Sequence, residues 1–133
     1  MPIEVEMVLR LLLAAALGAA IGYQRARAGK PAGVRDYTLI SVGSALFTVA
    51  SLYGFGAIAD PSRIAAGIVA GIGFLGAGAI IRTGEGFVGG LTTAATIWAV
   101  AGVGLAAGAG LYLISAVTTV IVLIVLFLPH PIR

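Results

Sequence analysis

The sequence has no cysteine, one histidine and few charges of either sign among its 133 residues. Without cysteine there is no disulfide, no thiolate metal site and no cysteine nucleophile, so cysteine usage says nothing about the redox compartment. Only 10% of the residues are charged, whereas a soluble domain usually carries about 25%. So little charge cannot cover a water-facing surface, which excludes both a soluble globular domain and a disordered tail.

The chain consists mainly of long apolar stretches. It is 60% hydrophobic, with 20 glycines and a mean hydropathy of +1.13. A membrane-spanning helix needs roughly 20 apolar residues, so five spans would use about 100 of them. Strands are excluded because they would leave backbone groups unpaired in lipid. We predict an all-α, polytopic membrane helical bundle that forms a single transmembrane domain over residues 1–133.

Glycine, proline and charged residues divide the chain into five apolar stretches. The predicted spans are about 5–24, 36–54, 61–82, 92–107 and 111–128. Asp60 is the expected N-cap of the third span, with Pro61 at its first helical position. The fourth span, at roughly 24 Å, is short for a core of about 30 Å. It must be buried among its neighbours, extended into residues 86–90, or partly re-entrant. The Gly108-Ala109-Gly110 turn predicts that the last two helices are antiparallel neighbours.

The charges around the first span predict whether it is cleaved as a signal peptide and how the chain is oriented in the membrane. Its start is acidic, with Glu4 and Glu6, and basic residues follow it, the reverse of a secretory signal, so we expect a retained span. Cytoplasmic loops carry an excess of Lys and Arg. That rule places the N-terminus outside and the C-terminus in the cytoplasm. The predicted cytoplasmic side holds Arg25, Arg27, Lys30, Arg35, Arg82 and Arg133, and the outer side holds Arg10 and Arg63.

An internal repeat is suggested at an offset of 57 residues. Arg25, Gly29 and Gly33 recur as Arg82, Gly86 and Gly90. The repeated unit would be two helices, with both copies crossing in the same sense about an axis along the membrane normal.

Polar residues near or inside the spans are the candidate functional positions, because charge in lipid is costly. The candidates are Arg10, Arg25, Arg35, Asp36, Asp60, Arg63, Arg82, Thr92 and Thr93. Arg10 either snorkels outward and pairs with Glu6, or places a charge inside the bundle. Asp60 either caps its helix or also bridges to Arg10 or Arg63.

The candidates on the predicted cytoplasmic side have two interpretations. They are Arg25, Arg35, Asp36, Arg82, Thr92 and Thr93. Thr92 and Thr93 open a helix, where free backbone amides and the helix dipole favour an anion. Alternatively, the basic residues of this group, together with Lys30, set the topology and contact anionic lipid headgroups.

Small residues at helical spacing predict close helix packing, within the chain or in a homo-oligomer, of which a dimer is favoured. The packing candidates are Gly18, Gly22, Gly67, Gly71, Gly78, Gly104 and Gly108. Hydroxyl side chains within the spans are expected to bond carbonyls of their own helices.

No catalytic constellation is recognisable. His130 lies between two prolines in the C-terminal tail, and Gly71–Gly76 matches GxGxxG only inside an apolar helix. The span centres lack the carboxylates expected of a cation carrier. We therefore expect no enzymatic activity, no cofactor, no metal site and no nucleic-acid partner.

Six segments carry a family resemblance: RLLL from Arg10, LGAAIG from Leu17, GVRDYTL from Gly33, DPSRIAA from Asp60, GIGFLGAGAI from Gly71 and GLTTAATIW from Gly90. Together they resemble the MgtC/SapB family of bacterial inner-membrane proteins, over about residues 8–125. The matching motif positions carry over Arg10, Arg35, Asp60, Arg63, Arg82, Thr92 and Thr93 as candidate functional residues.

The resemblance implies a virulence-associated membrane protein linked to magnesium limitation and survival inside macrophages. The best-known members are thought to restrain the proton-translocating ATP synthase and are not considered magnesium transporters. Two positions depart from the family pattern. Gly67 stands where glutamine is common, and Asp36-Tyr37 stands where threonine and histidine or asparagine often occur. Virulence-type members also carry a soluble ACT-like C-terminal domain, and the short form expected here lacks it.

Two functions of different classes remain open. The first is a non-enzymatic regulatory protein that binds another membrane component, in its own homo-oligomer or beyond it. The second is a small ion channel or carrier, with its pathway between repeat units. The apolar, glycine-rich spans favour the first, and a polar lining would favour the second.

Overall fold

The computed structural model describes residues 2–82 and 88–128, which form five helices joined by short connections. The helices are α1 (Ile3–Arg27), α2 (Val34–Tyr53), α3 (Ser62–Ala79), α4 (Leu91–Gly108) and α5 (Tyr112–Leu126). Two short strands, β1 (Ile81–Arg82) and β2 (Val88–Gly89), pair antiparallel between α3 and α4. The predicted helical bundle is confirmed, and the strand pair is a small addition at one end of it.

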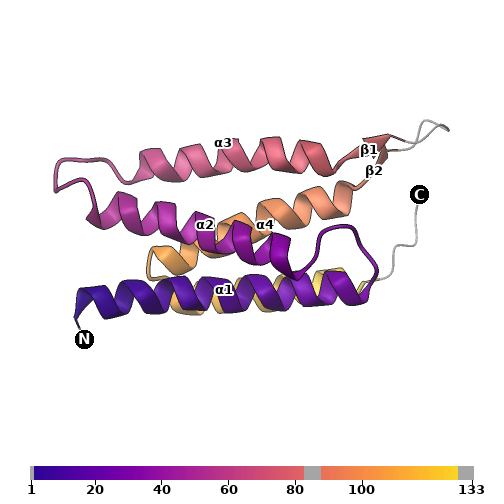
Figure 1. Cartoon of the computed structure of the whole chain (residues 1–133), viewed down its shortest axis with the longest axis horizontal. Coiled ribbons are helices and arrows are strands. Elements are labelled where there is room, and N and C mark those ends of the chain that lie inside the picture. The colour runs from indigo at the N-terminus through magenta and orange to yellow at the C-terminus, as the bar shows by residue number, and fades with distance from the viewer. Residues whose placement is uncertain (1, 83–87, 129–133) are drawn as a thin grey trace.

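The helices alternate in direction, with α1 and α3 running one way and α2 and α4 the other (Figure 1). The bundle therefore has two ends. The Arg10 end holds the start of α1, the α2–α3 loop and the α4–α5 turn, and the Arg25 end holds the α1–α2 loop and the strand pair. The described members of the two charged groups that the sequence assigns to opposite sides of a membrane lie at these opposite ends, and Arg133 lies outside the described residues.

Helix α4 is the central element of the bundle. It packs against each of the other four helices, and half of its apolar window is buried inside the structure. Its 18 residues extend over about 27 Å, still short of a full hydrocarbon core. Of the three fates expected for this short span, burial among its neighbours is the one observed.

Apolar side chains cover the outside of the bundle. Leu39, Phe74 and Leu113 are each at least 70% exposed. Patches of this kind are tolerated where lipid, and not water, is the solvent. The helices α1, α3 and α4 are long and apolar enough to cross a membrane, and α5 is a shorter apolar helix. Crossing by α2 and α5 stays a prediction.

The predicted repeat has a counterpart in the helix boundaries. Helix α2 begins at Val34 and α4 begins at Leu91, 57 positions later, each directly after a glycine. The pairs also match in packing, since α2 packs on α1 and α4 on α3. Gly86, the middle member of the second motif, lies outside the described residues.

Candidate functional site

Arg10 lies buried at one end of the bundle, with only 6% of its surface exposed. Its Nη1 donates to the carbonyl oxygen of Gly108 over 3.0 Å, and its Nε donates to Tyr112 Oη over 3.2 Å. Its Nη2 forms an ion pair with Glu6, one turn earlier on α1. Tyr112 in turn donates to the same Glu6 carboxylate over 3.2 Å. We call Glu6, Arg10, Gly108 and Tyr112 the Arg10 cluster.

The Arg10 cluster fastens α1 to the α4–α5 turn. Gly110 in this turn has φ +86°, a left-handed conformation that favours glycine. A Cβ atom at Gly110 would also come within 3.0 Å of Arg10 Nη2. The Arg10 guanidinium further lies 5.3 Å from the centre of the Tyr53 ring, within cation–π range. The charge is therefore compensated inside the bundle, which is typical of a structural clamp.

Asp60 does not take part in this cluster, contrary to the bridging alternative. Its carboxylate accepts from the Ser62 backbone N–H over 3.0 Å and from Ser62 Oγ over 2.7 Å. These hydrogen bonds lower the pKa of Asp60 below its usual range. Helix α3 starts at Ser62, one residue later than predicted, so its N-cap position is Pro61 and not Asp60. Asp60 precedes the cap and still accepts from the first helical N–H. The contact with Arg10 is absent because α2 and α4, and not α1, are the helices against which α3 packs.

Arg25 is the buried charge at the other end of the bundle, with 3% of its surface exposed. Its Nη2 donates to Thr93 Oγ1 over 2.7 Å and so ties the last turn of α1 to the first turn of α4. Tyr37, at the start of α2, is fully buried at the same end of the bundle, in a core with Ile21 and Ile97. We call Arg25, Tyr37 and Thr93 the Arg25 cluster. Within the described ranges, Arg25 Nε and Tyr37 Oη have no hydrogen-bond partner.

The other candidates at the Arg25 end whose side chains the structure describes do not hydrogen-bond to this cluster. Asp36 accepts from the Gly33 backbone N–H over 3.0 Å, which is a helix-capping contact. Arg35, Thr92 and Lys30 are exposed at the surface. Arg82 belongs to the β1 strand, and its side chain lies outside the description. The arrangement gives this end an exposed basic surface above one buried arginine, which suits contact with anionic groups.

Four of the packing glycines hold α2 against its neighbours. A Cβ atom at Gly18 or Gly22 of α1 would lie 2.6 Å from α2 backbone atoms. At Gly104 and Gly108 of α4 it would lie 2.2 and 2.6 Å from the carbonyl oxygens of α2 residues. Such distances leave no room for any side chain, so the backbones of α1, α2 and α4 are in direct contact.

The expected close contact is absent within the chain at three other glycines. A Cβ atom at Gly67, Gly71 or Gly78 of α3 would meet nothing within 4 Å. The reason is that α2 and α3 diverge and only α4 packs closely on α3. For these positions the packing prediction can hold only for contact with another molecule.

Sequence reasoning missed several contacts between helices. Ser44 donates across to the Ala101 carbonyl oxygen of α4 over 2.6 Å, whereas Thr48 bonds within its own helix as expected. Ser51 reaches the Pro61 carbonyl oxygen over 3.1 Å. Tyr112 could have been found from its place two residues after Gly110, at the same predicted side as Arg10. Nothing in the sequence signals the partner of Ser44.

Comparison with known proteins places the chain in a family. Residues 11–133 match the MgtC family, and the chain belongs to it. It is a multi-pass membrane protein, as the family and its apolar helices require. No solved structure matches it.

Three curated relatives illustrate the range of similarity. YhiD of Escherichia coli K12, whose name proposes it as a magnesium transporter, is 46% identical over 94% of this chain and 61% of its own length. SapB of Bacillus subtilis is 37% identical over 98% of the chain and 60% of its own length. MgtC of Brucella abortus is 49% identical over 86% of the chain and 48% of its own length. The chain thus spans about half to three-fifths of these relatives.

Proposed function

We propose that this chain is a non-enzymatic regulatory protein of the bacterial inner membrane, acting by contact with another membrane-protein complex. The proton-translocating ATP synthase is the candidate complex, and adaptation to magnesium limitation or intracellular stress is the setting. The observation that carries the proposal is the direct backbone contact of α2 with α1 and α4 at Gly18 and Gly104. Because backbone atoms fill the interior at these two positions, there is no room at either of them for a polar pathway between the helices.

The distribution of polar groups supports the same function. The Arg10 and Arg25 clusters lie at opposite ends of the bundle. Ala14, Ala45 and Ala107 form a buried apolar cluster where α1, α2 and α4 meet. The described acidic residues, Glu4, Glu6, Asp36 and Asp60, all lie near helix starts. A carrier needs polar or charged groups along its pathway. The outward-facing apolar side chains, by contrast, offer a large surface to a partner in the membrane.

The alternative is a small ion channel or carrier. It is favoured by the name of the YhiD relative and by the 57-residue spacing of α2 and α4. A pathway in that case would run between copies of the chain, which requires a homo-oligomer. A dimer, with its N-termini outside and C-termini in the cytoplasm, is our proposal for the assembled protein under either function.

Reconstitution separates the two functions. Purified protein is placed in liposomes, alone and together with ATP synthase, and magnesium flux, proton leak and ATP-driven proton pumping are measured. We expect no flux or leak above protein-free liposomes, and slower pumping when the two proteins share a membrane. A Gly104→Leu variant, which cannot keep the α2–α4 contact, is the matched control and should not slow pumping. Magnesium flux that scales with the amount of protein would overturn the proposal and favour the carrier.

A further inference from the structure

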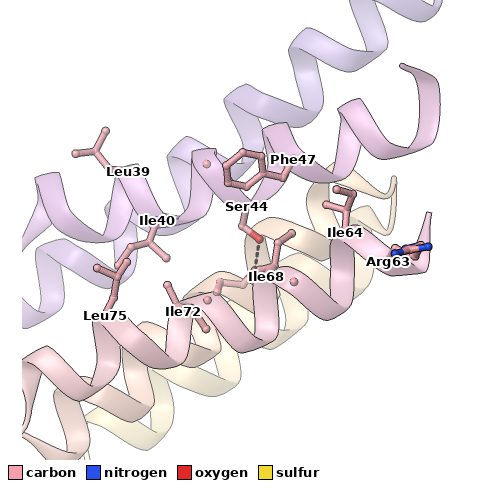
Figure 2. A pocket seen from close by; sticks show the side chains of 13 residues that line it. Leu39, Ile40, Ser44, Phe47, Arg63, Ile64, Ile68, Ile72 and Leu75 are labelled. Carbon is pink, nitrogen blue, oxygen red and sulfur yellow. Dashed lines mark hydrogen bonds between the residues drawn. The ribbon is translucent and has the colours of Figure 1, made fainter. Parts of the chain in front are cut away.

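A groove opens between α2 and α3 on the side of the bundle (Figure 2). Ile40 and Phe47 of α2 form one wall and Ile64 and Ile68 of α3 form the other. The buried Ala101 of α4 also lines the groove. The cavity volume is about 440 Å³. The groove exists because α2 and α3 diverge while both pack on α4.

Glycine keeps this groove open along its length. Gly43 of α2 and Gly67 and Gly71 of α3 line it, and a Cβ atom at any of them would meet nothing within 4 Å. The hydroxyl of Ser44 also lines it but already donates to the Ala101 carbonyl oxygen. The interior of the groove is therefore apolar, which suits a hydrocarbon occupant better than a polar solute.

A single positive charge stands at one end of the groove. Arg63, in the first turn of α3, lines the cavity at the Arg10 end, and Leu39 and Leu75 line its opposite end (Figure 2). No ion pair to Arg63 occurs among the residues that the structure describes. The neighbouring Asp60 carboxylate accepts from Ser62 through Oδ1 and forms no ion pair with Arg63. An exposed guanidinium at the mouth of an apolar groove complements a molecule with an anionic head and an apolar tail.

The length of the groove fits one leaflet of a bilayer. From Arg63 to Leu75 the helical rise gives roughly 18 Å, against a hydrocarbon core of about 30 Å for both leaflets together. A transmembrane helix of a partner would run through the full thickness, whereas an acyl chain fills about half of it. Charge and length therefore select the same occupant.

We infer that the α2–α3 groove binds an anionic phospholipid, with one acyl chain between the helices and its phosphate paired with Arg63. In the predicted topology this lipid belongs to the outer leaflet. The inference does not depend on the proposed regulatory function, since a lipid can occupy this groove in a regulator or in a carrier. It concerns this pair of helices and their charge alone.

The test is lipid retention, measured by native mass spectrometry on protein taken from nanodiscs of phosphatidylglycerol or of phosphatidylcholine. The parent protein should retain phosphatidylglycerol in preference to phosphatidylcholine. Gly71→Leu fills the groove and should lose the bound lipid. Gly73→Leu, on the same helix and equally unobstructed but outside the groove, should keep it. If Gly71→Leu fails to fold, Gly43→Leu blocks the opposite wall and gives the same readout.

A separate variant tests the contribution of the Arg63 charge. Arg63→Gln should bind phosphatidylglycerol roughly tenfold more weakly, as expected for a lost charge-assisted hydrogen bond, and should no longer prefer it to phosphatidylcholine. Equal retention by the parent and the two groove-filling variants would overturn the inference. So would a parent dimer that Gly71→Leu converts to a monomer with no change in bound lipid, since the groove would then be a contact between copies. If Arg63→Gln still prefers phosphatidylglycerol to phosphatidylcholine as strongly as the parent, Arg63 does not bind the phosphate and the inference is overturned.

Discussion

Arg25 and Thr93 are 68 positions apart in the chain, yet the guanidinium of one donates to the hydroxyl of the other over 2.7 Å in the interior. This hydrogen bond joins the end of α1 to the start of α4, across the two halves of the predicted repeat. Arg25 is the first residue of the repeat motif, and Thr93 lies just after the second copy's last glycine. The two halves are thus fastened together at the Arg25 end by side chains and along α2 by glycine contacts.

Removing the hydroxyl at Thr93 should expose how much this contact contributes. Thr93→Val deprives a buried cation of its acceptor, so we expect a loss of about 1.5–3 kcal/mol in the free energy of unfolding. Unfolding in mixed detergent micelles, followed by circular dichroism, measures it. Thr93→Ser should recover most of the loss, and Thr92→Val, at an exposed site, should be close to the parent. A Thr93→Val protein as stable as the Thr92→Val control would contradict the role of the hydrogen bond.

The contact between α2 and α4 can be tested at a glycine pair on one helix. A Cβ atom at Gly104 would lie 2.2 Å from the Ser41 carbonyl oxygen, whereas one at Gly102 would meet nothing within 4 Å. Gly104→Ala should therefore destabilise the bundle by about 1–3 kcal/mol, as overpacking commonly does. Gly102→Ala should cause no loss. Similar midpoints for the two variants in a thermal melt would show that the helices are not in contact there.

Asp60 should stabilise the start of α3 in a pH-dependent way, through its hydrogen bonds from Ser62. Ser62 holds the pKa of the carboxyl below its usual value, so the folded state favours the ionised form. The contribution to stability is complete above the unfolded pKa of about 3.9 and is lost as the pH falls through the lower folded value. Asp60→Ala should be less stable than the parent at pH 7, with a difference that shrinks in strong acid.

Asparagine separates capping from charge pairing at the same position. Asp60→Asn keeps a carbonyl oxygen that can accept from Ser62 but loses the charge that strengthens these bonds, so its stability at pH 7 should lie between those of Asp60→Ala and the parent. Thermal melts of the parent and both variants, measured from pH 7 downward, provide the comparison. A loss in Asp60→Asn as large as that in Asp60→Ala would mean that the carboxylate charge itself has a partner.

The predicted orientation can be read from two introduced cysteines, since the chain has none of its own. Lys30 and Ile58 are exposed on loops at opposite ends of the bundle, and Ile58 is 99% exposed. An impermeant maleimide added to intact spheroplasts should label Ile58→Cys and spare Lys30→Cys. Both should react once the membrane is opened. Labelling of Lys30→Cys in intact spheroplasts would show that the chain has the opposite orientation in the membrane.

Periodicity and composition predicted the elements of this protein because a bilayer restricts them so strongly. A chain with 60% hydrophobic residues in stretches broken by glycine, proline and charge has few alternatives to a helical bundle. The α4–α5 hairpin could also be predicted from the sequence. The turn around Gly110 is so short that the helices it joins must be antiparallel. Chain order also placed Arg10 and Arg25 at opposite ends of the bundle.

Which helices touch was decided only by the tertiary structure. Gly67, Gly71, Gly104 and Gly108 are alike in the sequence, yet the first two border an open groove and the other two touch α2. Spacing identifies a face of small residues but contains no information about the neighbour opposite it. For the same reason the sequence left open a bridge from Asp60 to Arg10 or Arg63, whereas Arg10 contacts Tyr112. Partner choice depends on how the helices diverge and cross, and that geometry comes from packing all five together.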